Sequence, residues 1–482
     1  MMRRERALLL VALLILARFV AGALLPLSAD EAYYWLWSQH LSAGYYDHPP
    51  AIAFLIRAGT LVFGDTSFGV RVGGLLLSIA ASWFVWKSAI LLLKNEQAAW
   101  RATLFFNAML MVAVETMAAT PDAPSVATAA AFLFCLVKVQ DSDDARWWLA
   151  AGVAAGLGLL SKYSALFIGA GALFWLLADP AQRRRLASPF PYAGAVIAVL
   201  IFAPNIWWNE THGWATFAFQ FGRIAGGGFT LRYLFEFIGA EALLATPFIF
   251  LLGIAGLVRV RRSEVFLAAA LCWPLIVYFL WHTLHDRVQG NWPCFLFPAF
   301  AILAAAALEM NWNGWRKKLI GICRVAALPA ALVLLALCYV QAFFNLIPLG
   351  RNDPLARLLA VGMSDVTEAV SKAERDNGAA GLLTTDYASA GWLRFYMPGE
   401  NVVAATEDFR WTEADVAGPA SMQKPLLYVV EDRRDQRQKL TALFSDVTPV
   451  GEVVRTAHGA AVGVYRMYRV SGWRGKEPGR LP

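Results

Sequence analysis

The stretch "ALLLVALLILARFVAGALLPL" at residues 7–27 decides the fold class. It follows the basic tail "MMRRER" and is almost entirely apolar. A run of about twenty such residues suits a helix that crosses a bilayer. The run is long for the apolar part of a signal peptide, and no clear small-x-small cleavage site precedes the polar loop that follows. We therefore expect an uncleaved first helix.

The rest of the chain has the composition of a polytopic membrane protein. Hydrophobic residues make up 58% of it and charged residues 16%, and the mean hydropathy is +0.50, whereas an ordinary soluble domain is about one quarter charged. Apolar runs recur to about residue 345, and the segments 146–161 and 163–178 are short enough to be half-helices or a broken pair. In all, we predict eleven helices, near 7–28, 68–93, 100–118, 123–139, 146–161, 163–178, 190–208, 237–258, 264–282, 293–309 and 319–344.

Basic residues between these segments predict the topology. When the eleven helices alternate in direction, the basic clusters all fall on one side of the membrane, which the positive-inside rule makes the cytoplasm. This arrangement explains the net charge of +7 without a nucleic-acid partner. The clusters lie at 3–6, 94–101, 138–146, 183–185, 259–262 and 316–318.

The count of eleven helices also divides the chain into two predicted domains. Residues 1–345 form the predicted all-α transmembrane domain, with a long external first loop at 29–67. The odd helix count puts residues 346–482 on the external face, opposite the cytoplasm. Strands are predicted at "GLLTTDY", "NVVAA", "PLLYVVED" and "GVYRMYRV", and helices at "DPLARLLAVGMSDVTEAVSKAER" and "DQRQKLTALF". We interpret this tail as a small α/β domain that caps the membrane part.

The first external loop, "SADEAYYWLWSQHLSAGYYDHPP" at 28–50, is rich in both rings and charges. Ser28 and Glu31 have the spacing of a capping box. The aromatic segment after them suits a helix at the membrane interface, and "AIAFLIRAGTLVF" suits a second one. Asp30, beside Glu31, is a carboxylate able to take a proton from a hydroxyl, and the alternative is a helix cap alone.

Further polar residues are predicted on the same external face. Asp122 lies in the turn "MAATPDAP", where it is either a turn residue or a functional acid, because a carboxylate at membrane depth is costly unless it is used or paired. His48, Lys162 and Arg287 are cations that could stabilise a phosphate leaving group, although Lys162 and Arg287 have snorkelling as their alternative. If Lys162 and Arg287 bind phosphate, their loss should weaken donor binding without unfolding the protein. Asp47, His285 and Asp286 are the remaining site candidates.

The five cysteines give no metal or disulfide signal. They lie in or beside apolar segments and show no metal-ligand spacing. We interpret them as small core residues and assign no metal site. They are Cys135, Cys272, Cys294, Cys323 and Cys338.

Four motifs carry a resemblance to a known family. "ADEAYYW", "GYYDHPP", "TPDAP" and "LLSKYSALF" resemble the GT-C membrane glycosyltransferases over roughly residues 7–345. The branch is that of the bacterial relatives of protein O-mannosyltransferases. It includes the aminoarabinose transferase that acts on lipid A and the galacturonosyltransferases that act on lipopolysaccharide core and lipid A.

The resemblance implies a chemistry and a set of residues. It implies a lipid-phosphate-linked sugar donor, an inverting transfer and no nucleotide sugar at the site. Asp30 is similar to the first-loop catalytic acid, Glu31 to its partner, and Asp122 to the second essential acid. His48 stands where the aminoarabinose branch has a lysine that contacts donor phosphate, and Lys162 and Arg287 fall near other phosphate-contacting positions. No cofactor is certain, and a divalent metal is kept as an option because the family's metal site varies.

The leading hypothesis is therefore a polyprenyl-phosphate-sugar-dependent glycosyltransferase. Its partners would be the lipid-linked donor, a lipid A, lipopolysaccharide or other cell-envelope acceptor, and membrane lipids. The alternative enzyme is a protein O-mannosyltransferase. The alternative of another class is a transporter or lipid flippase, for which we would expect polar groups near the bilayer midplane and often inverted repeats. Here the polar groups gather at one face and no repeat is seen.

Overall fold

The computed structural model describes residues 4–222, 228–260, 264–405, 410–411 and 419–475. The chain divides into two compact units. The first, here called the helical unit, contains 1–22, 47–52 and 71–337. The second, here called the α/β unit, contains 23–46, 53–70 and 338–482.

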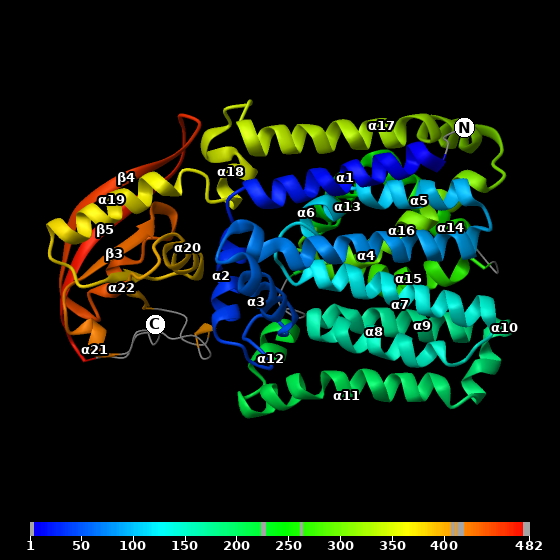
Figure 1. Cartoon of the computed structure of the whole chain (residues 1–482), viewed down its shortest axis with the longest axis horizontal. Helices are drawn as coiled ribbons and strands as arrows, with labels where there is room; N and C mark the ends of the chain where they lie inside the picture. Colours follow the sequence, from blue (N-terminus) through cyan, green and yellow to red (C-terminus); the bar gives the residue numbers. More distant parts are fainter. Residues whose placement is uncertain (1–3, 223–227, 261–263, 406–409, 412–418, 476–482) are drawn as a thin grey trace. The chain divides into compact units, whose positions relative to one another are not determined.

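The helical unit is built from mostly apolar helices of varied length (Figure 1). Four of them, α1 (Arg4–Leu24), α3 (Ala51–Phe63), α4 (Ser67–Leu93) and α17 (Gly314–Phe344), also contribute residues to the α/β unit. The others are α5 (Glu96–Ala108), α6 (Leu110–Glu115), α7 (Asp122–Ser142), α8 (Trp147–Ser161), α9 (Leu166–Ala178), α10 (Pro180–Arg183), α11 (Phe190–Thr211), α12 (Ala215–Gly222), α13 (Arg232–Leu244), α14 (Pro247–Arg259), α15 (Phe266–His282) and α16 (Phe297–Glu309).

Helices occur at all eleven predicted positions, but not all of them are long enough to cross a bilayer by themselves. Among the described residues, five helices are long and apolar enough to do so, namely α1, α4, α7, α11 and α17. Two bent pairs of helices raise this number to as many as seven, and four apolar helices are shorter. The chain is therefore polytopic, while a count of eleven crossings stays a prediction.

Two of the predicted helices are interrupted. The segment 100–118 forms α5 and α6, which are separated at Met109, whose backbone is extended (φ −64°, ψ 131°); nothing in the sequence signals this break. The segment 237–258 is bent by 108° between α13 and α14. Pro247 explains the second break, because proline lacks an N–H and disfavours helical geometry in the residue before it. That residue, Thr246, has a positive φ of 63°.

Glycines let two of the helices approach each other closely. A Cβ atom at Gly152 of α8 would lie 2.2 Å from the carbonyl oxygen of Gly194 in α11, and one at Gly194 would lie 2.4 Å from the carbonyl oxygen of Trp148. No side chain fits in either place. Small residues at crossings of this kind are typical of helix pairs in membranes.

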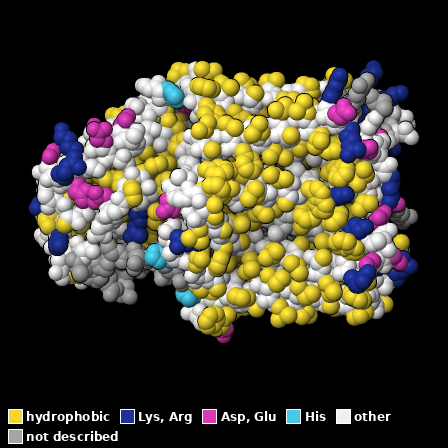
Figure 2. Space-filling model, in the orientation of Figure 1, with side chains coloured by type: hydrophobic (Ala, Val, Ile, Leu, Met, Phe, Trp, Pro, Cys, Tyr) yellow, Lys and Arg dark blue, Asp and Glu magenta, His cyan; other side chains and the backbone are white. Residues whose placement is uncertain are grey.

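The basic clusters gather at one end of the helical unit. Figure 2 shows Lys and Arg side chains at the end where α1 begins, and a broad hydrophobic surface over the helices. Ion pairs join the start of α1, the end of α4 and the start of α5 to acidic residues at the same end. They are Arg4–Glu96 (3.6 Å), Lys94–Asp141 (2.8 Å), Lys94–Glu264 (3.7 Å) and Arg101–Glu309 (2.6 Å).

The α/β unit is organised around a five-stranded mixed sheet in the order β2-β1-β3-β5-β4. β1 (Leu382–Thr384) is parallel to both β2 (Val402–Ala404) and β3 (Leu426–Glu431). β5 (Ala460–Trp473) is antiparallel to β3 and to β4 (Phe444–Ala457). The helices are α2 (Ala29–Gln39), α18 (Pro354–Leu358), α19 (Met363–Asp376), α20 (Tyr387–Tyr396), α21 (Pro419–Met422) and α22 (Arg437–Leu440).

The α/β unit differs from the prediction in three respects, one in its sheet and two in its helices. β4 was not predicted, because its sequence contains Pro449 and Gly451, which are unfavourable in a strand. Proline is tolerated on an edge strand, and the register shifts between these two residues. The predicted helix at 353–375 is two helices, separated before Gly362, which has a φ of 74°. The predicted helix "DQRQKLTALF" is reduced to the single turn of α22.

Candidate functional site

The N-terminus of α2 carries the first group of predicted site residues. The capping box is present: the Ser28 hydroxyl accepts from the Glu31 N–H at 3.2 Å, and a Glu31 carboxylate oxygen accepts from the Ser28 N–H at 2.8 Å. Glu31 is 1% exposed. The Glu31 carboxylate thus stabilises the start of the helix, and Asp30, which is half-buried, lies in its first turn, where the helix dipole favours a negative charge.

Asp30 is contacted by a residue far along the chain. The Tyr387 hydroxyl donates a hydrogen bond to the Asp30 carboxylate at 3.2 Å, across 357 residues of sequence. Burial raises the pKa of Tyr387 well above its ordinary value, and the Asp30 charge raises it further, so Tyr387 stays protonated as a donor. Helix α20, which begins at Tyr387, approaches α2 at Gly391, where a Cβ would lie 2.9 Å from the Tyr33 nitrogen.

Two arginines of the α/β unit surround Tyr387. The Arg410 guanidinium lies 4.9 Å from the centre of the Tyr387 ring and 5.5 Å from that of Tyr46. The Arg434 guanidinium lies 5.9 Å from the Tyr387 ring and pairs with Asp386, the N-cap of α20. The sequence did not predict any of these C-terminal residues as site residues. The Asp-Tyr pair at the end of "GLLTTDY" is a recognisable helix start, but nothing local connects it with α2.

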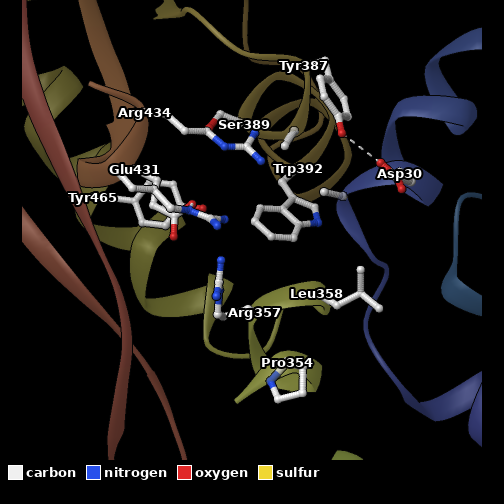
Figure 3. Close-up of a pocket in the computed structure, with 13 residues that line it drawn as sticks. Asp30, Pro354, Arg357, Leu358, Tyr387, Ser389, Trp392, Glu431, Arg434 and Tyr465 are labelled. Carbon is white, nitrogen blue, oxygen red and sulfur yellow. Dashed lines mark hydrogen bonds and ion pairs between the residues drawn. The ribbon is translucent and has the colours of Figure 1, made fainter. Parts of the chain in front are cut away.

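A cavity of about 330 Å³ opens beside Asp30 within the α/β unit (Figure 3). This volume is at the lower end of the roughly 300–1,000 Å³ that small-molecule sites occupy. Its lining combines charged, aromatic and hydroxyl side chains. Such a lining suits a polar molecule that also has one apolar face. Its main polar and aromatic lining residues are Asp30, Arg357, Tyr387, Ser389, Trp392, Glu431, Arg433, Arg434 and Tyr465.

The helical unit holds a second group, centred on Asp122. This residue begins α7 and is 2% exposed. Its carboxylate accepts hydrogen bonds from Lys162 Nζ at 2.6 Å, from Asn291 Nδ2 at 2.9 Å and from the Cys294 thiol at 2.8 Å. The Lys162 side chain is only 11% exposed. Asp122 and Lys162 therefore form a buried ion pair, and the snorkelling alternative for Lys162 is wrong in this structure.

Asn291 and Cys294 are residues of this group that sequence reasoning missed. Cys294 is buried, as a core residue would be, but its thiol points at a carboxylate rather than only at apolar neighbours. Both residues lie just after the loop at 283–290, in the stretch "GNWPC". The polar Asn291 between Gly and Trp at the start of an apolar run is the signal that was available.

Asp47 and His48 are the other predicted residues of the first loop. Asp47 is 7% exposed, and its backbone oxygen accepts from the Gln220 side chain at 2.5 Å. His48 is half-buried and precedes Pro49 at the start of α3. The two prolines after it fix the backbone there.

The predicted site residues of the loop after α15 contact neighbouring residues. Arg287 is 72% exposed and pairs with Glu236 of α13 at 3.3 Å. The Asp286 carboxylate accepts from the Arg287 N–H at 2.7 Å. His285 Nδ1 lies 3.2 Å from the Trp281 carbonyl oxygen. The segment just after this loop contributes Asn291 to the Asp122 group, whereas Arg287 pairs with Glu236.

Among the residues that the structure describes, no group of three or more His, Cys, Asp or Glu side chains could hold a metal ion. The described ranges therefore offer no ligand set for the divalent metal that the resemblance leaves open.

Comparisons with known proteins agree with this architecture. Residues 47–208 match the family model described as dolichyl-phosphate-mannose-protein mannosyltransferase. The chain is 27% identical over 364 residues to a lipid A galacturonosyltransferase, RgtD, of Rhizobium johnstonii, covering 74% of this chain and 72% of that protein. It is 26% identical over 407 residues to an undecaprenyl phosphate-α-4-amino-4-deoxy-L-arabinose arabinosyl transferase of Pseudomonas savastanoi pv. phaseolicola, covering 72% and 70%.

A solved structure shows the same fold. ArnT from Cupriavidus metallidurans, bound to undecaprenyl phosphate, superposes with a TM-score of 0.65 at 15% identity, over 97% of this chain and 98% of that one. The chain thus has the fold of the GT-C membrane glycosyltransferases. Within that class it is a relative of the bacterial transferases that modify lipid A and lipopolysaccharide, which confirms the resemblance seen in the sequence. It is a multi-pass inner-membrane protein.

Proposed function

We propose that this chain is an inverting glycosyltransferase that moves a sugar from a polyprenyl-phosphate-linked donor to a lipid A, lipopolysaccharide or other cell-envelope acceptor. The proposal is carried by Asp30, an acid at a helix N-terminus that lines a cavity of polar and aromatic side chains. Relatives named for undecaprenyl phosphate-linked aminoarabinose and for lipid A support the donor and acceptor classes.

In the proposed reaction, Asp30 takes the proton of an acceptor hydroxyl as the hydroxyl oxygen attacks the anomeric carbon. The bond from that carbon to the phosphate oxygen breaks, and polyprenyl phosphate leaves with the electron pair. Attack from the face opposite the leaving group inverts the anomeric centre. Tyr387 orients the carboxylate through its hydrogen bond. The cations His48, Lys162 and Arg287, which belong to the helical unit, keep their proposed role as phosphate-binding residues. Glu31 and Asp122 keep theirs as supporting acids.

The acceptor class is tested with the purified full chain in lipid nanodiscs. We expect a labelled polyprenyl-phosphate sugar to transfer its label to a lipid A or lipopolysaccharide fraction and not to serine- and threonine-containing peptides. Transfer to the peptides instead would favour a protein O-mannosyltransferase, which the family model names. Movement of lipid across vesicles without transfer would favour a flippase.

Arg287 is proposed to meet the donor phosphate from an exposed position, with Glu236 as its counterion when the donor is absent. The change Arg287→Ala should weaken donor binding by roughly 1.5–3 kcal/mol, the value of a hydrogen bond to a charged group. Stability should change by less than about 1 kcal/mol, because the existing pair is exposed. Equilibrium binding of labelled donor measures the effect, and unchanged affinity would remove Arg287 from the site. Arg232→Ala, which removes the other partner of Glu236, is the matched control.

The topology is proposed to comprise eleven crossings, with the N-terminus in the cytoplasm and residues 346–482 in the periplasm as a separate domain. The basic end of the helical unit supports this orientation through the positive-inside rule. A C-terminal alkaline phosphatase fusion should be active, and a C-terminal GFP fusion should be dark. A bright GFP fusion would place the C-terminus in the cytoplasm and contradict the proposed topology.

A further inference from the structure

Two buried polar side chains, those of Trp392 and Tyr465, line the cavity beside Asp30. Tyr465 is 1% exposed and Trp392 is 3% exposed. Neither the Tyr465 hydroxyl nor the Trp392 indole N–H makes a hydrogen bond to any residue that the structure describes. Burial raises the pKa of Tyr465 above its ordinary range, so its hydroxyl keeps a proton to donate. Buried donors are nearly always satisfied in native proteins, which points to a partner beyond the residues that the structure describes.

Three arginines line this cavity, and two of them form ion pairs with described residues. Arg433 is bonded to Glu431 at 2.7 Å, and Arg434 pairs with Asp386. Arg357, on the short helix α18, is exposed, and over the described ranges of the chain its guanidinium has no hydrogen-bond or ion-pair partner. Figure 3 shows the Arg357 guanidinium and the Tyr465 hydroxyl pointing toward one another, with the Trp392 ring beside them.

These features specify the chemistry of a ligand. A guanidinium without a counterion favours a carboxylate or phosphate, with which arginine forms paired, charge-assisted hydrogen bonds. The buried Tyr465 hydroxyl and Trp392 N–H supply two further donors at the same place. The indole ring adds an apolar surface, which suits the carbon face of a sugar ring. The volume of about 330 Å³ fits a small molecule rather than a chain.

We propose that this cavity binds an acidic group, carboxylate or phosphate, on the sugar of the acceptor. The assignment to the acceptor rests on the proposed function, in which Asp30, at the edge of the same cavity, takes a proton from an acceptor hydroxyl. Arg357 binds the acidic group, Tyr465 and Trp392 donate to its oxygens or to ring hydroxyls, and the anion thereby sets which hydroxyl reaches Asp30. The cavity is a specificity site that selects acidic glycolipids over neutral ones.

Binding is tested without turnover, so that its result does not depend on the proposed reaction. The full chain in nanodiscs of zwitterionic lipid is titrated with galacturonate and with N-acetylglucosamine 1-phosphate, followed by saturation-transfer NMR. Galactose and N-acetylglucosamine are the neutral counterparts. We expect at least one acidic sugar to bind more tightly than its counterpart, and Arg357→Ala to weaken that binding by about tenfold or more.

Two further variants distinguish binding in the cavity from binding through general surface charge. Tyr465→Phe should also weaken binding of the acidic sugar, whereas Arg375→Ala should not, because Arg375 is an exposed arginine of α19 in the same unit that does not line the cavity. If acidic and neutral sugars bind equally, or if Arg357→Ala behaves like Arg375→Ala, the cavity is filled by ordinary water and the proposal is wrong.

Transfer kinetics then test the assignment to the acceptor. With phosphorylated and dephosphorylated forms of one glycolipid, Arg357→Ala should raise the KM of the phosphorylated form about tenfold and leave the KM of the dephosphorylated form and of the donor unchanged. A rise in the donor KM alone would overturn the assignment to the acceptor. If no donor supports transfer at all, the proposed function fails, while the binding result still stands or falls by itself.

Discussion

Replacing Asp30 with asparagine should lower turnover by about 10²–10⁴-fold, the typical contribution of a general base. Asparagine keeps the size of the side chain and its ability to cap a helix, and its carbonyl oxygen still accepts from the Tyr387 hydroxyl. What it loses is the capacity to take a proton. Initial rates of sugar transfer at saturating donor and acceptor measure the effect.

Two variants control this result. Glu31→Gln keeps an oxygen that can accept from the Ser28 N–H, and it should cost much less turnover than Asp30→Asn if Glu31 mainly stabilises the helix start. Tyr387→Phe removes the hydrogen bond to Asp30 but leaves the base in place, so its loss of turnover should also be smaller. Near wild-type turnover in Asp30→Asn with a hydroxyl acceptor would shift the role of base to Asp122 or Asp47.

Removing Lys162 should have the largest effect on stability. Lys162→Ala leaves the Asp122 carboxylate buried without its counterion, and breaking a buried pair in this way costs about 3–5 kcal/mol. Considered from the sequence alone, the same change would be expected to weaken donor binding without unfolding. The 2.6 Å contact with Asp122 changes that expectation. Thermal or denaturant unfolding in detergent, followed in parallel with donor binding, measures both effects.

A double variant separates the charge pair from its role in the reaction. Asp122→Leu combined with Lys162→Met removes both charges, and its stability should recover most of what Lys162→Ala loses, because apolar replacement of a whole buried pair is often neutral. If the pair also serves the reaction, the double variant stays inactive although it is folded. Wild-type stability in Lys162→Ala would show that the pair is open to water and contradict the buried geometry.

The helices were predictable because the signal for them is local. A run of apolar residues must be helical in a bilayer, where every backbone polar group needs a partner within the segment, and Ser28 and Glu31 are three residues apart. The break at Met109 has no local signal. β4 was missed because an edge strand with Pro449 needs no apolar alternation, only a partner such as β5.

The candidate site was predictable only where one short segment carries it. Asp30 and Asp122 stand in recognisable motifs, and their positions follow from helix starts. Their partners come from elsewhere: Tyr387 reaches Asp30 across 357 residues, and Cys294 reaches Asp122 across 172. Such contacts depend on packing between distant helices, which no local pattern encodes. Arg287 was predicted as a phosphate-binding residue from its charge. Whether it contacts a ligand depends on the residues around it in the fold, which the local sequence does not specify.

The central claim is that the donor is a polyprenyl-phosphate sugar transferred with inversion. The direct measurement is to incubate the purified full chain with a labelled undecaprenyl-phosphate sugar and a lipid A acceptor, and to analyse the products by mass spectrometry and NMR. The account predicts one undecaprenyl phosphate released for each sugar transferred, with the anomeric configuration of the new bond opposite to that of the donor. A product with retained configuration, or transfer supported by a nucleotide sugar and not by the lipid-linked one, would contradict it.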